Sequence, residues 1–281
     1  MPRPNIEIYG IVNFEKMSQL LIDYPIISNN YFFPRPLTLQ DFPEKEFGRL
    51  HFIPTPDGID LTAYNYAPHQ KAGTLVHFHG NGEVIVDYLD GFHGELEKIG
   101  LNSFFVEYRG YGLSGGEPRL SQLLEDVPTV LKYLSERIGV PSDRTVIMGR
   151  SIGSLFAVEA AYRLKNQFAG LIIESGIADL TERLLLRVEP AEIGGNPDQF
   201  FDEINRYFNQ QEKMAAINQP LLVLHTVNDG LVDPGHGQSL YEWCGSFRKQ
   251  IEFFDRGNHN TIFYENTREY FYLMGEFAKS L

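Results

Sequence analysis

The chain has 281 residues, of which 43% are hydrophobic and 22% are charged, and this composition excludes a disordered or collagen-like protein. Its formal net charge of −13 repels phosphate backbones and anionic lipid headgroups, so we expect no nucleic-acid partner. The single cysteine, Cys244, excludes an internal disulfide and a metal site built from several thiolates.

Neither export nor a membrane span is expected. The first 14 residues, MPRPNIEIYGIVNF, lack the apolar stretch and the small-residue cleavage site of a secretory signal. The apolar run over residues 19–27 is interrupted by Asp23 and Pro25, and it is shorter than the ~20 residues that cross a bilayer. The sequence therefore predicts a cytoplasmic protein without integral membrane contact.

A clear secondary-structure pattern begins at residue 47. Strand-like runs over residues 47–55 and 59–68 flank a Pro-Asp-Gly turn and predict an antiparallel hairpin. Short apolar strands then alternate with helices. We expect these strands over residues 74–80, 102–108, 144–149, 170–175, 220–226 and 249–255. We expect the helices up to about residue 99, over 120–138, from 151, over 236–244 and at the C-terminus.

Strands that are apolar throughout must be covered on both faces, as parallel strands with crossover helices are. The alternation therefore predicts an α/β fold with a doubly wound, mostly parallel, eight-stranded sheet and one core over residues 47–281. We expect residues 1–46 to form an N-terminal extension packed on this core, and residues at about 177–219 to form a small helical cap before the seventh strand. Function in such sheets gathers at the carboxyl ends of the strands.

Two Gly-x-Ser-x-Gly pentapeptides are present, centred on Ser114 and Ser151. A nucleophilic serine of this type sits on a sharp turn between a strand and a helix, with glycines where the chain packs closely. Residues 144–164 supply this pattern around Ser151. Ser114 lies beyond its strand in a Gly-rich and Pro-rich stretch that favours a loop. We therefore predict Ser151 as the nucleophile, rather than as a simple helix N-cap.

A serine hydroxyl needs a base within hydrogen-bonding reach and a third group that orients the base. His259 directly follows the last strand, at the same edge of the sheet as Ser151, and is the predicted base. The orienting carboxylate is expected after the strand at 220–226, where Asp229 and Asp233 are both candidates.

An oxyanion intermediate needs two backbone donors. The residue after the nucleophile, Ile152, supplies the first, and the amide of Asn81, beside Gly80 in the loop after the third strand, is expected to supply the second. His77 and His79 lie in the same stretch without a third ligand nearby, so we expect no metal site and no cofactor.

From residue 47 to its end the chain resembles the α/β-hydrolase superfamily. The resemblance rests on HGNGE at 79–83, YRGYGLSGG at 108–116, GRSIG at 149–153, Asp229 before LVDP, and GNHN at 257–260, in the family's order. The second of these segments and the compact cap are similar to a branch of intracellular serine hydrolases that includes esterases, thioesterases acting on acylated proteins and aminopeptidase-like members. A small-molecule or acylated substrate is implied.

Two positions depart from this family pattern, and one position separates the chain from other users of the fold. Glu107 ends the fourth strand where many relatives have Asp, and Asn258 places one extra residue before His259. Haloalkane dehalogenases and epoxide hydrolases share the fold but carry Asp in the sharp turn where this chain has Ser151. The serine therefore argues against these two activities.

Three carboxylates are candidates for the acid that orients His259. Asp229 lies in the turn directly after its strand, whereas Asp233 precedes Pro234 and is typical of a helix cap. Glu174 ends the sixth strand, where some relatives of this fold carry the acid. We predict Asp229.

These residues predict a serine hydrolase that cleaves a carboxylic ester or thioester through an acyl enzyme. Two alternatives stay open: an aminopeptidase-like amide hydrolase, and a ligand-binding protein that retains the fold. Apolar residues of the cap either line an acyl pocket or pack its helices together, and the same choice applies to YFFPRP at residues 31–36. These cap residues are Leu184, Leu185, Leu186, Phe200, Phe201, Tyr207 and Phe208.

Overall fold

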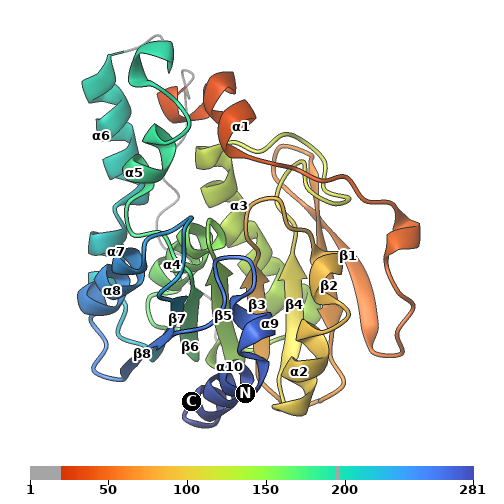
Figure 1. Ribbon diagram of the computed structural model, residues 1–281. Helices are drawn as coiled ribbons and strands as arrows, with labels where there is room; N and C mark the ends of the chain where they lie inside the picture. The colour runs from red at the N-terminus through yellow and green to blue at the C-terminus, as the bar shows by residue number, and fades with distance from the viewer. Residues whose placement is uncertain (1–19, 194–195) are drawn as a thin grey trace.

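The computed structural model describes residues 20–193 and 196–281, so residues 1–19 of the predicted extension lie outside the described residues. Eight strands form one sheet in the order β1-β2-β4-β3-β5-β6-β7-β8 (Figure 1). They are β1 (Gly48–Pro54), β2 (Asp60–Tyr66), β3 (Thr74–Phe78), β4 (Asn102–Val106), β5 (Thr145–Arg150), β6 (Gly170–Glu174), β7 (Leu221–Thr226) and β8 (Lys249–Phe254). Strand β2 runs antiparallel to β1 and β4, and the other pairs are parallel. The predicted mostly parallel, eight-stranded α/β sheet is confirmed.

Helices cover both faces of this sheet (Figure 1). On one face lie α3 (Leu120–Tyr133), α4 (Gly153–Arg163) and α8 (Pro234–Trp243), and on the other lie α2 (Phe92–Lys98), α9 (Ile262–Glu265) and α10 (Thr267–Lys279). Successive strand residues alternate between the two cores, so that Val76 packs with α3 and α4 while Leu75 packs with α2 and α10. Every residue of β3 to β7 is buried as a result, which explains their mostly apolar sequences.

Two segments lie outside the alternating pattern and pack against each other. The first contains α1 (Pro25–Tyr31) and 3₁₀ turns at Leu21–Asp23 and Leu39–Asp41. The second, the cap, contains α5 (Leu180–Leu185), a 3₁₀ turn at Pro190–Ile193, α6 (Pro197–Phe208) and α7 (Gln210–Ala215). Helix α1 contacts the turn at Pro190–Ile193, and α6 contacts the turn at Leu21–Asp23. No helix in the described part of the chain has both the length and the apolar character of a membrane span.

The predicted helix before residue 99 differs in detail. A 3₁₀ turn at Ile85–Tyr88 precedes α2, because the backbone N–H of Ile85 donates to Glu107 Oε1 at 2.7 Å and that of Val84 to Asp87 Oδ2 at 3.0 Å. These side-chain acceptors, one of them distant in the sequence, fix the chain in place of regular helical hydrogen bonds. Such contacts shift where a helix begins or ends, so the boundaries of an element are harder to predict from sequence than its presence.

Candidate active site

Ser151 lies in the turn between β5 and α4 with a φ of 53°, a left-handed conformation that is strained for a residue with a side chain. Its backbone N–H donates to the Glu174 carbonyl at 2.9 Å, which holds the turn against β6. A Cβ on Gly149 would overlap the Gly153 carbonyl, and a Cβ on Gly153 would overlap the Phe78 carbonyl at the end of β3. The two flanking glycines therefore let α4 start directly against the sheet.

Three predicted site residues meet at this turn. His259 Nε2 lies 3.0 Å from Ser151 Oγ, and His259 Nδ1 lies 2.7 Å from Asp229 Oδ2. The loops after β5, β7 and β8 supply the three side chains. Ser151 is 8% exposed, Asp229 is 7% exposed and His259 is 6% exposed. A serine, an imidazole and a carboxylate in this order form the geometry of a nucleophile, a base and an orienting acid.

Asp229 is held as an anion by several donors. Its Oδ1 accepts the backbone N–H groups of Leu231 at 2.9 Å and Val232 at 2.8 Å. Burial alone would raise the pKa of Asp229, but hydrogen bonds from His225 and His259 hold it well below its usual range. An ionised carboxylate beside Nδ1 keeps the proton on that nitrogen, so Nε2 is free to accept the proton of Ser151.

His225 is a neighbour of this carboxylate that the sequence reasoning missed. Its Nε2 lies 3.0 Å from the Val232 carbonyl and 3.3 Å from Asp229 Oδ2. A carbonyl can only accept, so Nε2 of His225 carries the hydrogen and faces both oxygens. A histidine within the strand, four residues before Asp229, was the signal available in the sequence.

The competing carboxylates have other partners. Asp233 Oδ1 accepts the Gly235 N–H at 2.7 Å and caps α8, as predicted. Glu174 accepts from Arg150 Nε at 2.8 Å and from the hydroxyl of Tyr270. Both groups are thus engaged away from the His259 ring.

The competing serine is also engaged elsewhere. Ser114 Oγ accepts the Thr62 N–H at 2.8 Å, which ties its loop to β2. The structure therefore brings Ser151, and not Ser114, together with His259.

A buried arginine, which the sequence reasoning also missed, joins two loops around the site to the end of β6. Arg150 Nη1 pairs with Glu83, Nε pairs with Glu174, and Nη2 donates to the His259 carbonyl at 2.5 Å. We call Arg150, Glu83 and Glu174 the arginine cluster. Burial opposes the charge of Arg150, but the two carboxylates raise its pKa above the ordinary value. The cluster ties the loop after β3 to the end of β6 and to the loop that carries His259.

The two amides predicted to bind an oxyanion are not used elsewhere. Within residues 20–193 and 196–281, the backbone N–H groups of Ile152 and Asn81 have no hydrogen-bond acceptor. Glu83 Oε2 accepts the Gly80 N–H at 2.6 Å, and Gly82 has a φ of 76°, so the loop folds back sharply at Asn81. Both N–H groups are available for a ligand.

His79 lies beneath this loop, between two hydrogen-bond acceptors. Its Nδ1 is 2.7 Å from the Gly80 carbonyl and its Nε2 is 3.1 Å from Glu107 Oε2. Both partners accept, so both ring nitrogens carry hydrogen. Burial alone would lower the pKa of His79, but the hydrogen bond and charge of Glu107 raise it above the ordinary value.

His77 has different surroundings from His79. Its ring packs against Tyr88, Phe92 and Phe105, and burial lowers its pKa to about 3. No group of three His, Cys, Asp or Glu side chains among the described residues is arranged to hold a metal ion.

The cap residues singled out in the sequence divide into two groups. Leu184, Phe200 and Phe208 are buried in the core, so they pack the cap together. Leu185 and Leu186, in α5 and at its C-terminal end, are 40% and 66% exposed. Phe201 and Tyr207 are half-buried against the core.

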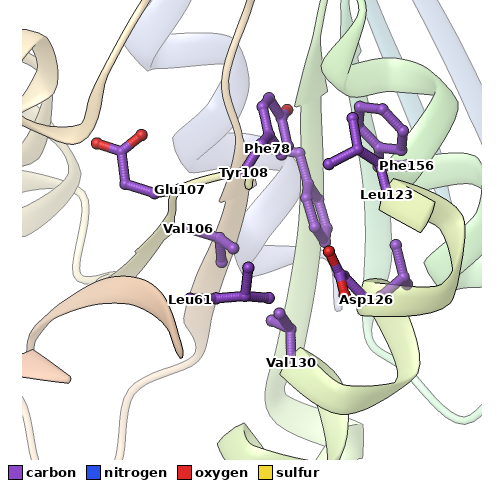
Figure 2. A pocket seen from close by; sticks show the side chains of 10 residues that line it. Leu61, Phe78, Val106, Glu107, Tyr108, Leu123, Asp126, Val130 and Phe156 are labelled. Carbon is purple, nitrogen blue, oxygen red and sulfur yellow. The ribbon is translucent and has the colours of Figure 1, made fainter. Parts of the chain in front are cut away.

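A small cavity of about 10 Å³ lies between the sheet and α3 (Figure 2). It is lined by Leu61, Phe78, Val106 and Val130 among others, and the Glu107 carboxylate points away from it (Figure 2). A volume of this size holds about one water molecule at most. Neither Ser151 nor His259 lines it, so it is no substrate site.

Known proteins are similar to this chain in sequence or in structure. The family model described as serine aminopeptidase, S33, matches residues 69–193, which is less than half of the chain. The chain is 27% identical over 218 residues to the α/β-hydrolase domain-containing protein WAV2 of Arabidopsis thaliana, covering 74% of this chain and 71% of that protein. It is 26% identical over 275 residues to protein bem46 of Schizosaccharomyces pombe, covering 90% and 89%. A solved structure of an esterase from Pyrococcus furiosus matches with a TM-score of 0.68 at 19% identity, covering 89% of this chain and 97% of that one. The resemblance to α/β hydrolases is confirmed.

Proposed function

We propose that this chain, which has the α/β-hydrolase fold, cleaves a carboxylic ester or thioester through an acyl enzyme on Ser151. The observation that carries the proposal is the hydrogen-bonded sequence of groups from Ser151 Oγ through the His259 ring to Asp229, at 3.0 and 2.7 Å. A solved esterase with a similar fold supports the choice of an ester-type substrate.

In the proposed first half-reaction, Ser151 Oγ attacks the substrate carbonyl carbon while His259 Nε2 takes its proton. Asp229 stabilises the imidazolium that forms, and the amides of Ile152 and Asn81 donate to the oxyanion. The intermediate collapses by releasing an alcohol or thiol, which receives the proton from His259. Ser151 is left acylated.

In the second half-reaction, water attacks the acyl carbon. His259 takes a proton from this water and returns it to Ser151 as the carboxylic acid leaves. The same three side chains and two amides therefore serve both halves, and no cofactor is required.

Amide hydrolysis is the second candidate, because the family model that matches residues 69–193 is that of serine aminopeptidases. The same catalytic groups can cleave an amide if the site also binds the substrate's amino terminus. Parallel assays with p-nitrophenyl esters, acyl thioesters and aminoacyl p-nitroanilides separate the two. We expect turnover of the first two classes, whereas faster cleavage of the anilides would favour the aminopeptidase.

The serine assignment is tested by Ser151→Ala, with Ser114→Ala as the matched control. We expect Ser151→Ala to lower turnover on the order of 10⁶-fold and to abolish labelling by a fluorophosphonate, since the nucleophile is gone. Ser114→Ala removes the acceptor of the Thr62 N–H and costs about 1–3 kcal/mol of stability, with turnover largely kept. A wild-type protein that binds esters but does not turn them over would instead be a ligand-binding protein.

A further inference from the structure

The segment after α1 crosses the loops at the carboxyl ends of β3 and β4. We call residues 31–37, which begin at the last residue of α1, the strap (Figure 1, the red chain that leaves α1). The Gly112 N–H donates to the Arg35 carbonyl at 2.8 Å, and the Leu37 N–H donates back to the Gly112 carbonyl at 2.9 Å. Arg35 also binds the Gly82 carbonyl at 3.2 Å and Asp87 at 2.6 Å. The strap is thus bound to both loops.

The side chain of Asn81 is the centre of these contacts. Its Oδ1 accepts the Phe33 N–H at 3.0 Å and the Tyr111 hydroxyl at 2.7 Å, and its Nδ2 donates to the Tyr31 carbonyl. Tyr111 is fully buried and also accepts the Phe33 N–H at 3.0 Å. An amide group held from both its oxygen and its nitrogen has one orientation.

The buried side of the strap anchors it to the rest of the fold. Tyr31 and Phe32 are 4% and 3% exposed and belong to the main core, whereas Phe33 is 44% exposed with the Arg187 guanidinium 5.0 Å from its ring centroid. The burial of these two aromatic side chains in the core stabilises the strap. The strap is therefore a firm support for the hydrogen bonds that it makes.

We infer that the strap is part of the active site, and that the Asn81 side chain and Tyr111 are positioning residues that aim the Asn81 backbone N–H at the oxyanion. This inference rests on the proposed hydrolase function. The loop at Asn81 turns between two glycines, so no regular structure fixes the direction of its peptide groups. An oxyanion donor works only within about 2.7–3.1 Å of the developing charge, and clamping the side chain fixes the residue that bears it.

The variants Asn81→Ala and Tyr111→Phe test this inference. Asn81→Ala keeps the backbone N–H but loses all three side-chain anchors, and Tyr111→Phe removes one hydroxyl and keeps the packed ring. We expect kcat to fall about 10- to 100-fold in Asn81→Ala, a part of the 10²- to 10³-fold loss when a donor is removed outright, and up to about tenfold in Tyr111→Phe. KM should stay within about twofold, because the substrate before attack carries no oxyanion.

Inhibition by a trifluoromethyl ketone distinguishes positioning of the oxyanion donor from simple support of the fold. The adduct of this ketone with a serine carries the oxyanion, so its affinity depends on the donor. Its inhibition constant should rise by the same factor by which kcat/KM falls, while inhibition by the carboxylate product stays unchanged. Tyr133→Phe is the matched control, since it removes a tyrosine hydroxyl that contacts His51 Nδ1 at 3.3 Å, away from the strap. We expect wild-type kinetics from this control.

Three outcomes would overturn the inference. Unchanged kcat in Asn81→Ala, a loss of kcat that only follows a fall in Tm, or unchanged ketone affinity each leaves the strap as a structural support. In these cases wild-type turnover and its loss in Ser151→Ala would keep the proposed function intact. If wild-type protein shows neither turnover nor labelling at Ser151, the proposed function fails and the inference fails with it.

Discussion

Ser151 and Arg150 are consecutive residues, yet their side chains enter two different buried networks. Ser151 leads through the His259 ring to Asp229, and Arg150 joins Glu83 and Glu174 and reaches the His259 carbonyl. In the proposed mechanism, a proton of the first network moves between the Ser151 oxygen and the His259 nitrogen. The second contains a guanidinium fixed between two carboxylates. His259 belongs to both, with its ring in the first and its backbone in the second.

Burial does not distinguish the acids of these two networks. Asp229 is 7% exposed and Glu174 is 1% exposed, and they follow or end the neighbouring strands β7 and β6. Their partners differ, because one carboxylate faces an imidazole that can change charge and the other faces a guanidinium that cannot. We therefore expect Asp229 to act in the reaction and Glu174 to support the structure. Exchanging each carboxylate for its amide separates these roles.

Asp229→Asn should produce the largest effect. We expect turnover to fall by up to about 10⁴-fold, because the imidazole then favours the wrong tautomer and its cation loses a partner. The fold should be retained, since Asn keeps an acceptor for the Leu231 and Val232 N–H groups. Steady-state kinetics and circular dichroism check both parts. Near-normal turnover in this variant, with collapse in Glu174→Gln, would move the acid to the sixth strand.

The pH dependence of stability provides an independent check on Asp229. Its pKa is lowered in the folded protein, so its charge stabilises the fold above the ordinary value of about 3.8 and this contribution is lost as pH falls through the folded value. The Tm difference between wild type and Asp229→Asn should therefore shrink below about pH 4. A difference that stays constant to low pH would indicate that Asp229 is not held as an anion.

Glu174→Gln should change stability more than chemistry. The substitution leaves buried Arg150 with one carboxylate in place of two, and we expect a loss of about 3 kcal/mol in the free energy of unfolding. Turnover of the folded variant should stay within about tenfold of wild type. Urea unfolding and kinetics on the same preparation measure the two quantities. A large loss of turnover without destabilisation would show that Glu174 acts in the reaction, like the residues of the first network.

The two networks also differ in how far the sequence predicts them. Each expected strand has a counterpart in the sheet, and the turn around Ser151 was recognisable because strand, glycines and helix are consecutive in the chain. Asp229 and His259 were recognisable from their places after strands. The partners of Arg150 and Asn81 were not, since Arg150 meets His259 across 109 positions and Asn81 meets Tyr31 across 50. Local patterns fix elements, but such contacts depend on how the completed fold packs.

A side chain of the cap, outside both networks, should give a smaller effect. Leu185 is 40% exposed, and we expect Leu185→Ala to change the preference among acyl chain lengths a few-fold while Tm stays within a few degrees. Leu184→Ala is the matched control, because Leu184 is fully buried and its truncation should cost about 2–5 kcal/mol of stability. An unchanged preference with a lower Tm in Leu185→Ala would make this residue part of the cap's packing.

The smallest effect is expected from Asp233→Asn, a third carboxylate at the same edge of the sheet. Asn is as good a helix N-cap as Asp, so α8 should keep its cap and stability should change by less than about 1 kcal/mol. Turnover should remain at the wild-type level in the assay that exposes Asp229→Asn. A 10³-fold loss would show that the acid had been assigned to the wrong member of the pair.

The most direct test of the central claim is to map a fluorophosphonate adduct by mass spectrometry after labelling the full-length protein. The account predicts one adduct per chain, on the peptide that contains Ser151, formed at a rate that falls sharply in Asp229→Asn. An adduct on Ser114 would contradict the account. So would a protein that the fluorophosphonate does not label and that still hydrolyses esters at the wild-type rate after the treatment.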